Sequence, residues 1–132
     1  MAGQLIISTL SDGTNSTSST NCIKGSAQAW ISFTYISFTL STLASYNVSS
    51  ITKSSAGVYV IVMTNALIDA NYAVIASAGA ITTAGSTCNA HPHSSSTATY
   101  VAPTSSTFTV NIVNEAGTSL AEPYTCAVAV HR

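Results

Sequence analysis

The sequence predicts an all-β protein: an antiparallel β-sandwich, similar to a jelly roll, of about eight strands with an extended N-terminal arm. Two observations lead to this prediction. Apolar and polar side chains alternate over most of the chain, as they do in half-buried strands. Turn-forming residues interrupt the alternation at short intervals, and no segment shows a convincing helical period. A chain of 132 residues is long enough for one domain with a sizeable core.

The N-terminal segment differs from the rest and is expected to form the arm. After the short apolar run LIISTL, the sequence SDGTNSTSSTN contains no apolar residue that could contribute to a core. We therefore expect an arm or linker over residues 1–23 and a β-sandwich domain over residues 24–132.

Three later segments alternate regularly enough to predict which side chains face the core. The inward set comprises Ala27, Ala29, Ile31, Phe33 and Tyr35 in the first segment, Phe108, Val110 and Ile112 in the second, and Cys126, Val128 and Val130 in the third. The outward set comprises Gln28, Trp30, Ser32 and Thr34 in the first segment and Thr107, Thr109 and Asn111 in the second. The segment 44–49 is expected to be strand or turn because Asn-Val-Ser follows Tyr46.

The composition predicts self-association. Charged residues make up only 5% of the chain, whereas ordinary domains have about 25%. The polar surface is instead supplied by 41 Ser and Thr residues. The segment VYVIVM, residues 58–63, is apolar on both faces, so a neighbouring subunit is expected to cover the face that the core does not. The residues expected at this contact are Trp30, Tyr35, Phe38, Tyr59 and Ile61.

The charge and apolar patterns argue against two kinds of partner. The net charge is −1 with three Lys and Arg residues, which is too few cations for nucleic acid or for a basic membrane-binding patch. No apolar run approaches the length of a membrane-spanning helix, so no membrane insertion is expected. The N-terminus lacks the positive region of a signal peptide.

The residue types that carry chemistry are few and scattered. The acids Asp12, Asp69, Glu115 and Glu122 show no paired spacing, and the chain lacks the GxSxG, P-loop and HExxH motifs. We therefore expect no enzymatic activity and no cofactor. The odd number of cysteines, at widely spaced positions, fits neither a zinc site nor a disulfide framework, so buried reduced thiols are expected at Cys22, Cys88 and Cys126.

The segment CNAHPH contains the only cluster of potential metal ligands. His91 and His93 are two residues apart and would share one face of a regular strand, so three copies around an axis could offer six imidazoles to a metal ion. Pro92 lies between them and argues against a regular inner strand. We therefore predict a surface loop and no metal site, with His91 and His93 as weak candidates.

Four segments together resemble a module of tailed-phage virion proteins, in particular of tail fibres. They are AQAWISF at 27–33, SYNVSSIT at 45–52, YVIVMT at 59–64 and DANY at 69–72. The resemblance covers roughly residues 10–75. Two departures occur: Gln28 replaces the usual Lys, and TYISFTLSTL continues where the family has an Asn-Gly-type turn after the position of Phe33.

The resemblance implies a non-enzymatic virion structural protein of tail-fibre or receptor-binding type that works as a homotrimer. Such a protein would be assembled in the host cytoplasm, where thiols stay reduced. The arm would attach it to other phage structural proteins through Leu5, Ile6 and Ile7, and the distal loops would meet solvent or a host-surface glycan.

Two alternatives remain open. The first is a capsid decoration protein, either a cement protein or a head fibre, with the same fold. The second is a carbohydrate-binding module, in which Tyr100, Tyr124 and the Ser- and Thr-rich loops could contact a sugar.

Overall fold

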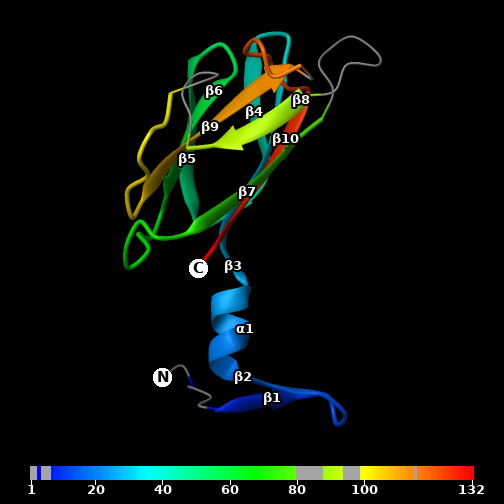
Figure 1. Ribbon diagram of the computed structural model, residues 1–132, viewed down its shortest axis with the longest axis vertical. Coiled ribbons are helices and arrows are strands. Elements are labelled where there is room, and N and C mark those ends of the chain that lie inside the picture. The colour runs from blue at the N-terminus through cyan, green and yellow to red at the C-terminus, as the bar shows by residue number, and fades with distance from the viewer. Residues whose placement is uncertain (1–2, 4–6, 80–87, 94–98, 115) are drawn as a thin grey trace.

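The structure, a computed structural model, describes residues 3, 7–79, 88–93, 99–114 and 116–132. Two four-stranded antiparallel sheets face each other in a β-sandwich, which confirms the predicted fold class (Figure 1). A hairpin and a short helix precede the sandwich. In chain order the elements are β1 (Thr9–Ser11), β2 (Ser16–Ser18), α1 (Ser19–Gly25), β3 (Ala27–Ile36), β4 (Thr39–Tyr46), β5 (Val48–Ser55), β6 (Val58–Met63), β7 (Ala73–Ala78), β8 (Cys88–Pro92), β9 (Thr107–Asn114) and β10 (Thr125–His131).

The first sheet has the strand order β4-β3-β10-β7, and the second has the order β5-β6-β9-β8. The first and last strands of the sandwich, β3 and β10, pair at the centre of the first sheet, with Val128 opposite Ile31. The chain passes from the first sheet to the second between β4 and β5. There Asn47 has a left-handed φ of 53°, which Asn tolerates better than most residues. The predicted strand–turn character of this segment is confirmed.

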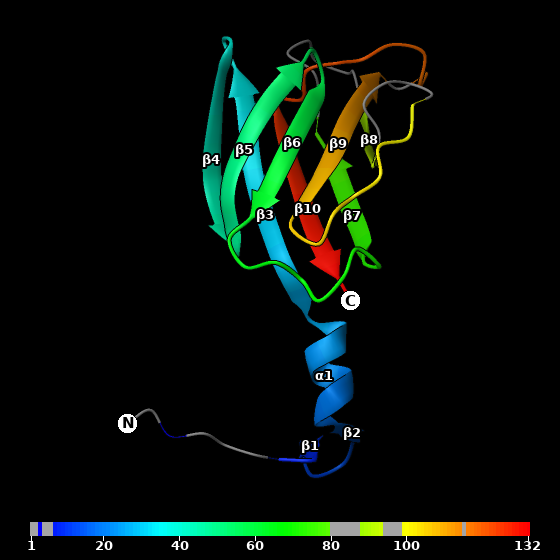
Figure 2. The same cartoon turned by 90° about the vertical axis from the view of Figure 1, so that its left-hand side faces the viewer.

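The two ends of the sandwich differ. The end that carries the β3–β4 turn, the β5–β6 turn and the loop before β10 lies away from the helix, and we call it the tip (Figure 2). The opposite end, which we call the arm end, joins the helix α1 and carries the C-terminal residue Arg132 (Figure 2). The helix therefore joins the sandwich at the end opposite to these turns.

The core lies between the two sheets and contains the inward-facing residues that alternation predicts, with Ala27 and Tyr35 only partly buried. Tyr59, Ile61 and Met63 of β6, together with Tyr72, complete it. The rings of Phe33 and Tyr59 lie 4.9 Å apart between centroids, so the two largest fully buried side chains, one from each sheet, contact each other directly.

Strand β9 is buried more deeply than its alternation predicts. The alternation places Thr109 and Asn111 on the outward face, but both are buried, with Asn111 fully inaccessible. Asn111 lies on an internal strand, between Val58 of β6 and His91 of β8 in register. Burial of a neutral polar side chain costs much less than burial of an unpaired charge, which fits the absence of charged residues from this strand.

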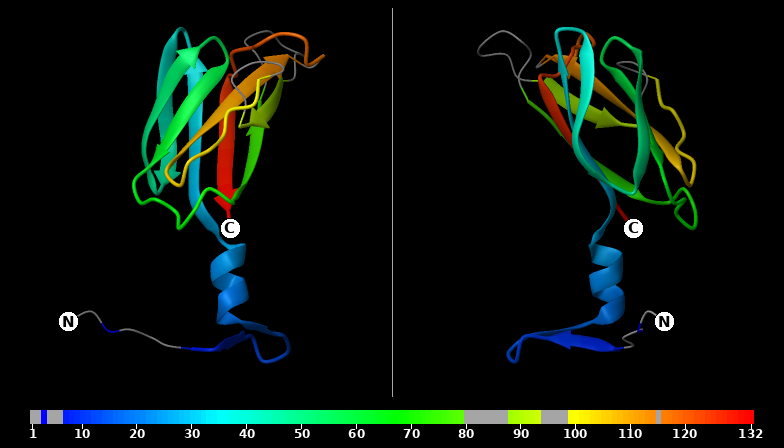
Figure 3. Two further views of the ribbon diagram at one scale, coloured as in Figure 1. Left: turned by 60° about the vertical axis from the view of Figure 1, so that its left-hand side comes forward. Right: turned by 180° about the vertical axis from the view of Figure 1, so that it is seen from behind.

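The arm contains a hairpin and a helix, which corrects the expectation that the chain has no helix. Figure 3 shows the helix α1 and the β1–β2 hairpin extending away from the sandwich. The amide of Ser19 donates to the carbonyl of Ser8 at 2.9 Å, and Ser26 donates through its amide to Cys22 and through its hydroxyl to Ile23. Capping bonds of this kind satisfy the ends of a seven-residue helix that is too short to show periodicity in the sequence.

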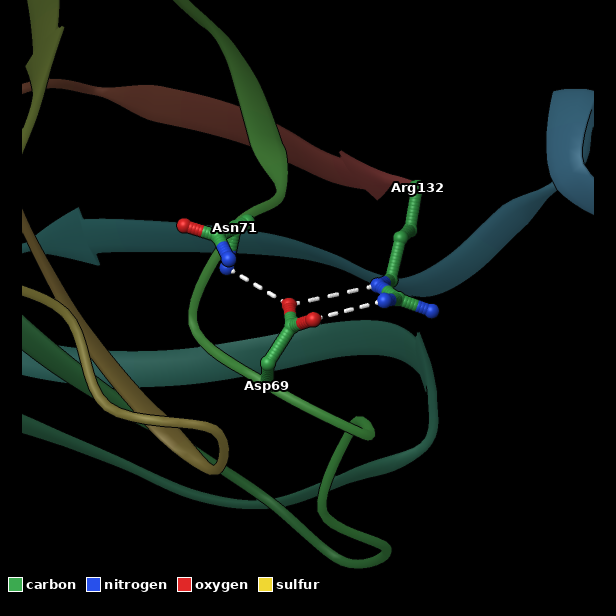
Figure 4. A network of polar contacts seen from close by, with 3 residues as sticks. All are labelled: Asp69, Asn71 and Arg132. Atoms are coloured by element: carbon green, nitrogen blue, oxygen red, sulfur yellow. Dashed lines mark hydrogen bonds and ion pairs between the residues drawn. The ribbon is translucent and has the colours of Figure 1, made fainter.

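Polar contacts tie the arm end together. The guanidinium of Arg132 binds the carboxylate of Asp69 at 2.6 Å and 3.3 Å, and the amide of Asn71 donates to the same carboxylate at 2.8 Å (Figure 4). The side chain of Asn47 donates to the carbonyl of Gln28 and accepts from the amide of Asn65. These contacts fix the ends of β3 and β10 against the β6–β7 loop.

Candidate functional site

The outer face of the first sheet is the first candidate site, because it is exposed and uncharged. None of its strands, β3, β4, β7 and β10, contains Asp, Glu, Lys or Arg. Exposed sheets ordinarily carry charged side chains on the solvent side, which keep them hydrated and unpaired. These four described strands therefore leave the face without the charged side chains that an exposed sheet ordinarily carries.

A row of apolar side chains crosses this face. Tyr46, Trp30, Ala129 and Ile75 occupy adjacent register positions on the four strands. Tyr46 is 59% exposed, Trp30 40% and Ile75 62%. Because three large apolar side chains lie in one line on the solvent side, they form a contiguous patch and are not scattered surface residues.

Between Trp30 and Ile75 the face is hollowed into a groove of about 300 Å³. Small side chains form its floor, so the large residues on either side stand above it. The groove is lined by Trp30, Ile31, Ser32, Ile75, Ser77, Ala127, Val128 and Ala129. The face therefore has both projecting and recessed parts.

The structure separates the five residues predicted for the subunit contact. Trp30 lies on the exposed face of the first sheet, and Phe38 is exposed at the tip. Tyr35 is half-buried against the core. Tyr59 and Ile61 are fully buried inside the subunit, so their assignment to the contact is wrong. A strand that is apolar on both faces gives no sequence signal for which face is inward.

Strand β6 still presents an apolar surface outward. Val60 and Val62 alternate with the buried Tyr59 and Ile61 and are only half-buried. The sequence analysis did not identify Tyr46 and Ile75 as candidates. Their positions beside Trp30 depend on how the strands pair, and the order of apolar residues along the chain does not show that pairing.

The tip is the second candidate site. The β3–β4 turn consists of Ser37 and Phe38, whose φ values are 50° and 63°. Two successive left-handed residues make the tight turn that suits a twisted hairpin, usually with Asn or Gly. Phe38 is an unusual occupant, because it is both left-handed and 93% exposed.

Beside Phe38 lies a fixed polar cluster around Glu122. One carboxylate oxygen of Glu122 binds the ammonium of Lys53 at 2.9 Å, and the other accepts a hydrogen bond from the hydroxyl of Tyr59 at 2.6 Å. The ammonium of Lys53 also lies 4.9 Å from the ring centroid of Tyr35. A cavity of about 360 Å³ opens here and is lined by Tyr35, Ser37, Phe38 and Glu122.

The electrostatics of the cluster keep its groups in fixed states. The hydrogen bond to Glu122 raises the pKa of Lys53, so Lys53 stays an ammonium. Burial, and next the bond to Glu122, raise the pKa of Tyr59 far above its usual value, so its hydroxyl remains a donor. Sequence reasoning missed Lys53 and Glu122 as a pair because only the fold brings them together.

The two histidines of CNAHPH do not share a strand face. The predicted surface loop is wrong for most of this segment, because Cys88–Pro92 form the strand β8. Strand β8 lies at the edge of its sheet, where a proline can be accommodated. His91 is exposed, whereas His93 has a φ of 57° and packs against Tyr72 and Phe108. Burial lowers the pKa of His93. Within the described part of the chain, no three His, Cys, Asp or Glu side chains come together as metal ligands.

The other predicted residues lie apart from these two sites. In the arm, Ile7 is exposed and Leu5 and Ile6 fall outside the described residues. Cys126 is a buried thiol as expected, but Cys22 is exposed on α1, so the expectation of burial is wrong there. The side chain of Cys88 also falls outside the described part.

The two tyrosines considered for sugar contact are not neighbours. Tyr124 immediately precedes β10 and lies near the tip. Tyr100 packs beside His93, with 6.5 Å between the ring centroids, at the end of β8 that is farther from the tip.

No helix in the described segments is long and apolar enough to cross a membrane.

Compared with known proteins, the chain matches no protein-family model, no curated protein sequence and no solved structure.

Proposed function

We propose that the protein is a non-enzymatic structural subunit of a bacteriophage virion, of tail-fibre or receptor-binding type, that works as a homotrimer. The observation that supports this most is the uncharged outer face of the β4-β3-β10-β7 sheet with its exposed row of Trp30, Tyr46 and Ile75. The resemblance of residues 10–75 to tail-fibre modules supplies the viral context.

The uncharged face favours another copy of the chain as the partner. Water contact with Trp30, Tyr46 and Ile75 is unfavourable. Full burial of an exposed large apolar side chain gains about 1.5–3 kcal/mol, and each of these partly exposed side chains would gain part of that. A partner with a charged surface would lose hydration on this face without gaining an ion pair. A second copy offers a matching apolar surface at equal concentration, and homo-oligomers are the commonest soluble assemblies.

A closed trimer requires two different patches on each subunit, because its contacts run head to tail. The outer face of the first sheet supplies one patch. The half-buried Val60 and Val62 on the outer side of β6 are the candidate for the second. The sequence analysis also expects a neighbouring subunit at this strand, but through Tyr59 and Ile61, which the structure places in the core.

The positions of the arm and the tip fit a projecting subunit. The arm leaves the sandwich at one end and exposes the apolar side chains of Ile7, Leu10 and Ile23. We propose that these side chains dock on other phage structural proteins. The tip then points away from the particle, toward solvent or the host surface.

A capsid decoration protein is the alternative that shares these observations, since a cement or head-fibre subunit also needs an anchoring arm and a shared apolar face. The two functions differ in location. Antibody-labelled particles would show tail labelling for the tail-fibre function and labelling over the head for decoration. Deletion of residues 1–23 should abolish incorporation into the particle in both cases.

Light scattering after size-exclusion chromatography tests the assembly. We expect the wild-type chain to be a trimer at micromolar concentration and Trp30→Lys to be a monomer with an unchanged circular dichroism spectrum. Ile68→Lys is the matched control, because Ile68 is exposed in the β6–β7 loop away from the sheet face. A monomeric wild-type protein, or a trimer that tolerates Trp30→Lys, would contradict the proposal.

A further inference from the structure

We propose that the tip carries a binding site for a neutral sugar ring, lined by Tyr35, Phe38 and Glu122, with Lys53 ion-paired to Glu122 beside it. The use of this site for host attachment rests on the proposed function, whereas the binding itself rests only on the geometry of the tip. The ligand class is a hexose or N-acetylhexosamine with an unblocked pair of neighbouring hydroxyls.

Phe38 supplies an aromatic surface that the subunit does not use. Its side chain is 93% exposed, and its backbone is held in the left-handed region at a φ of 63°. A bulky residue in this conformation is strained, and Asn or Gly would form the turn more readily. An exposed aromatic ring that persists against its own backbone preference indicates a role in contact with a ligand.

Glu122 and Lys53 supply polar groups in fixed positions. Each oxygen of Glu122 has one partner, Lys53 at 2.9 Å or the Tyr59 hydroxyl at 2.6 Å, and each carboxylate oxygen can accept a further hydrogen bond. The side chains remain partly accessible, 25% for Lys53 and 30% for Glu122. Neighbouring sugar hydroxyls can therefore donate to the carboxylate and accept from the ammonium without rearranging the cluster.

The volume of the cavity can accommodate one sugar ring. Its volume of about 360 Å³ falls at the lower end of the range of small-molecule sites, about 300–1,000 Å³. Phe38 and Tyr35 line it together with Ser37 and Glu122. The apolar face of a pyranose can then cover an aromatic ring while its hydroxyl edge faces Glu122.

The charges favour a neutral ligand over a cationic one. An aromatic pair beside a carboxylate could in principle hold a quaternary ammonium group. Here Lys53 neutralises Glu122, and its ammonium already lies 4.9 Å from the ring centroid of Tyr35. A second cation would be repelled by Lys53, and an anion would meet the carboxylate of Glu122.

Titration of the ¹⁵N-labelled full chain with methyl glycosides of glucose, galactose and N-acetylglucosamine tests the site by NMR. We expect saturable shifts of the amides of Phe38, Lys53 and Glu122 for at least one sugar, with a dissociation constant on the order of 1 mM. Choline chloride is the probe for the cationic alternative. Saturable binding of choline at the tip without sugar binding, or no saturable shift with any of the three sugars, would overturn the proposal.

Three variants make the test specific. Phe38→Ala and Glu122→Gln should each weaken sugar binding by about tenfold or more, whereas Tyr46→Ala, an exposed aromatic residue on the sheet face, should leave it unchanged. The side chain of Phe38 lies almost wholly in solvent, so its removal should leave the fold intact. Unchanged sugar affinity in Phe38→Ala would overturn the proposal.

Light scattering on the same samples separates the two proposals. Trp30→Lys should bind sugar with the affinity of the wild type, because Trp30 lies outside the tip. If the wild-type chain is a monomer that binds sugar, the trimer proposal is wrong and the sugar-site proposal is supported. If instead Phe38→Ala dissociates the oligomer, Phe38 is a subunit contact and the sugar site is wrong.

Discussion

Replacing Gly57 by Ala should both destabilise the sandwich and disturb the tip. Gly57 has a φ of +64°, and a Cβ atom there would lie 2.7 Å from the carbonyl oxygens of Ala121 and Ile112 and 3.0 Å from the amide nitrogen of Ala121. All three atoms belong to the backbone, so they cannot move aside as the end of a flexible side chain can. The β5–β6 turn approaches the loop before β10 this closely only because Gly57 has no side chain.

The magnitude follows from two terms. An L residue in the left-handed region costs roughly 1–2 kcal/mol relative to glycine. Forcing an extra carbon into a packed site costs about 1–3 kcal/mol. We therefore expect Gly57→Ala to lower the free energy of unfolding by about 2–5 kcal/mol. Because Ala121 precedes Glu122, displacement of this backbone should also weaken sugar binding at the tip.

Urea denaturation at one fixed protein concentration measures the change, since the stability of the proposed oligomer would depend on concentration. Gly117→Ala is the matched control. Gly117 has nearly the same φ, +69°, and a Cβ atom there would meet no atom of the described residues within 4 Å, so only the backbone cost of roughly 1–2 kcal/mol remains. Equal losses in the two variants would refute the steric part of the reasoning.

Two further predictions concern pH. Arg132 lowers the pKa of Asp69, so the stability from this pair should be present above the unfolded pKa of about 3.9 and lost as the pH falls below it. In acid titration, Asp69→Asn should therefore lose less stability than the wild type. An identical loss in the two proteins would contradict the role of the pair. Burial raises the pKa of Tyr72 to about 12, so its contribution should be full below pH about 10 and lost between there and pH 12. Tyr72→Phe removes the titrating hydroxyl and its hydrogen bond to the Thr104 carbonyl at 2.8 Å. We expect this variant to lower the free energy of unfolding by about 1 kcal/mol at pH 7 and to lose less stability than the wild type above pH about 10. A variant as stable as the wild type in urea would show that the bond contributes nothing.

Alternation in the sequence is enough to predict the core of β3 and β10. Ile31 and Phe33 alternate with polar neighbours, so only one face can be buried, and the structure places both in the core. The same reasoning fails for β6, where Tyr59 and Val60 are both apolar and the pairing of β6 with β9 decides which is inward. It fails also for Asn111, which alternation places outward and which is fully buried.

The candidate sites can be predicted only in part. The position of Trp30 between Ile31 and Ala29 predicts that it faces outward, but the row it forms with Ile75 requires the order of the strands. At the tip, Tyr59 and Glu122 are 63 residues apart, and no local pattern connects them. Pairing across a sheet depends on topology, and topology is what a single sequence specifies least directly.

If subunits associate through a sheet without charged side chains, the stability of their contacts should depend on temperature and salt differently from that of contacts made by ion pairs. Contacts that rely on apolar burial weaken on cooling and strengthen in sulfate, because sulfate is excluded from protein surfaces. Contacts that rely on ion pairs behave differently, since added salt screens them. Complexes joined through the β4-β3-β10-β7 sheet should therefore come apart near 0 °C at low salt and be preserved by ammonium sulfate.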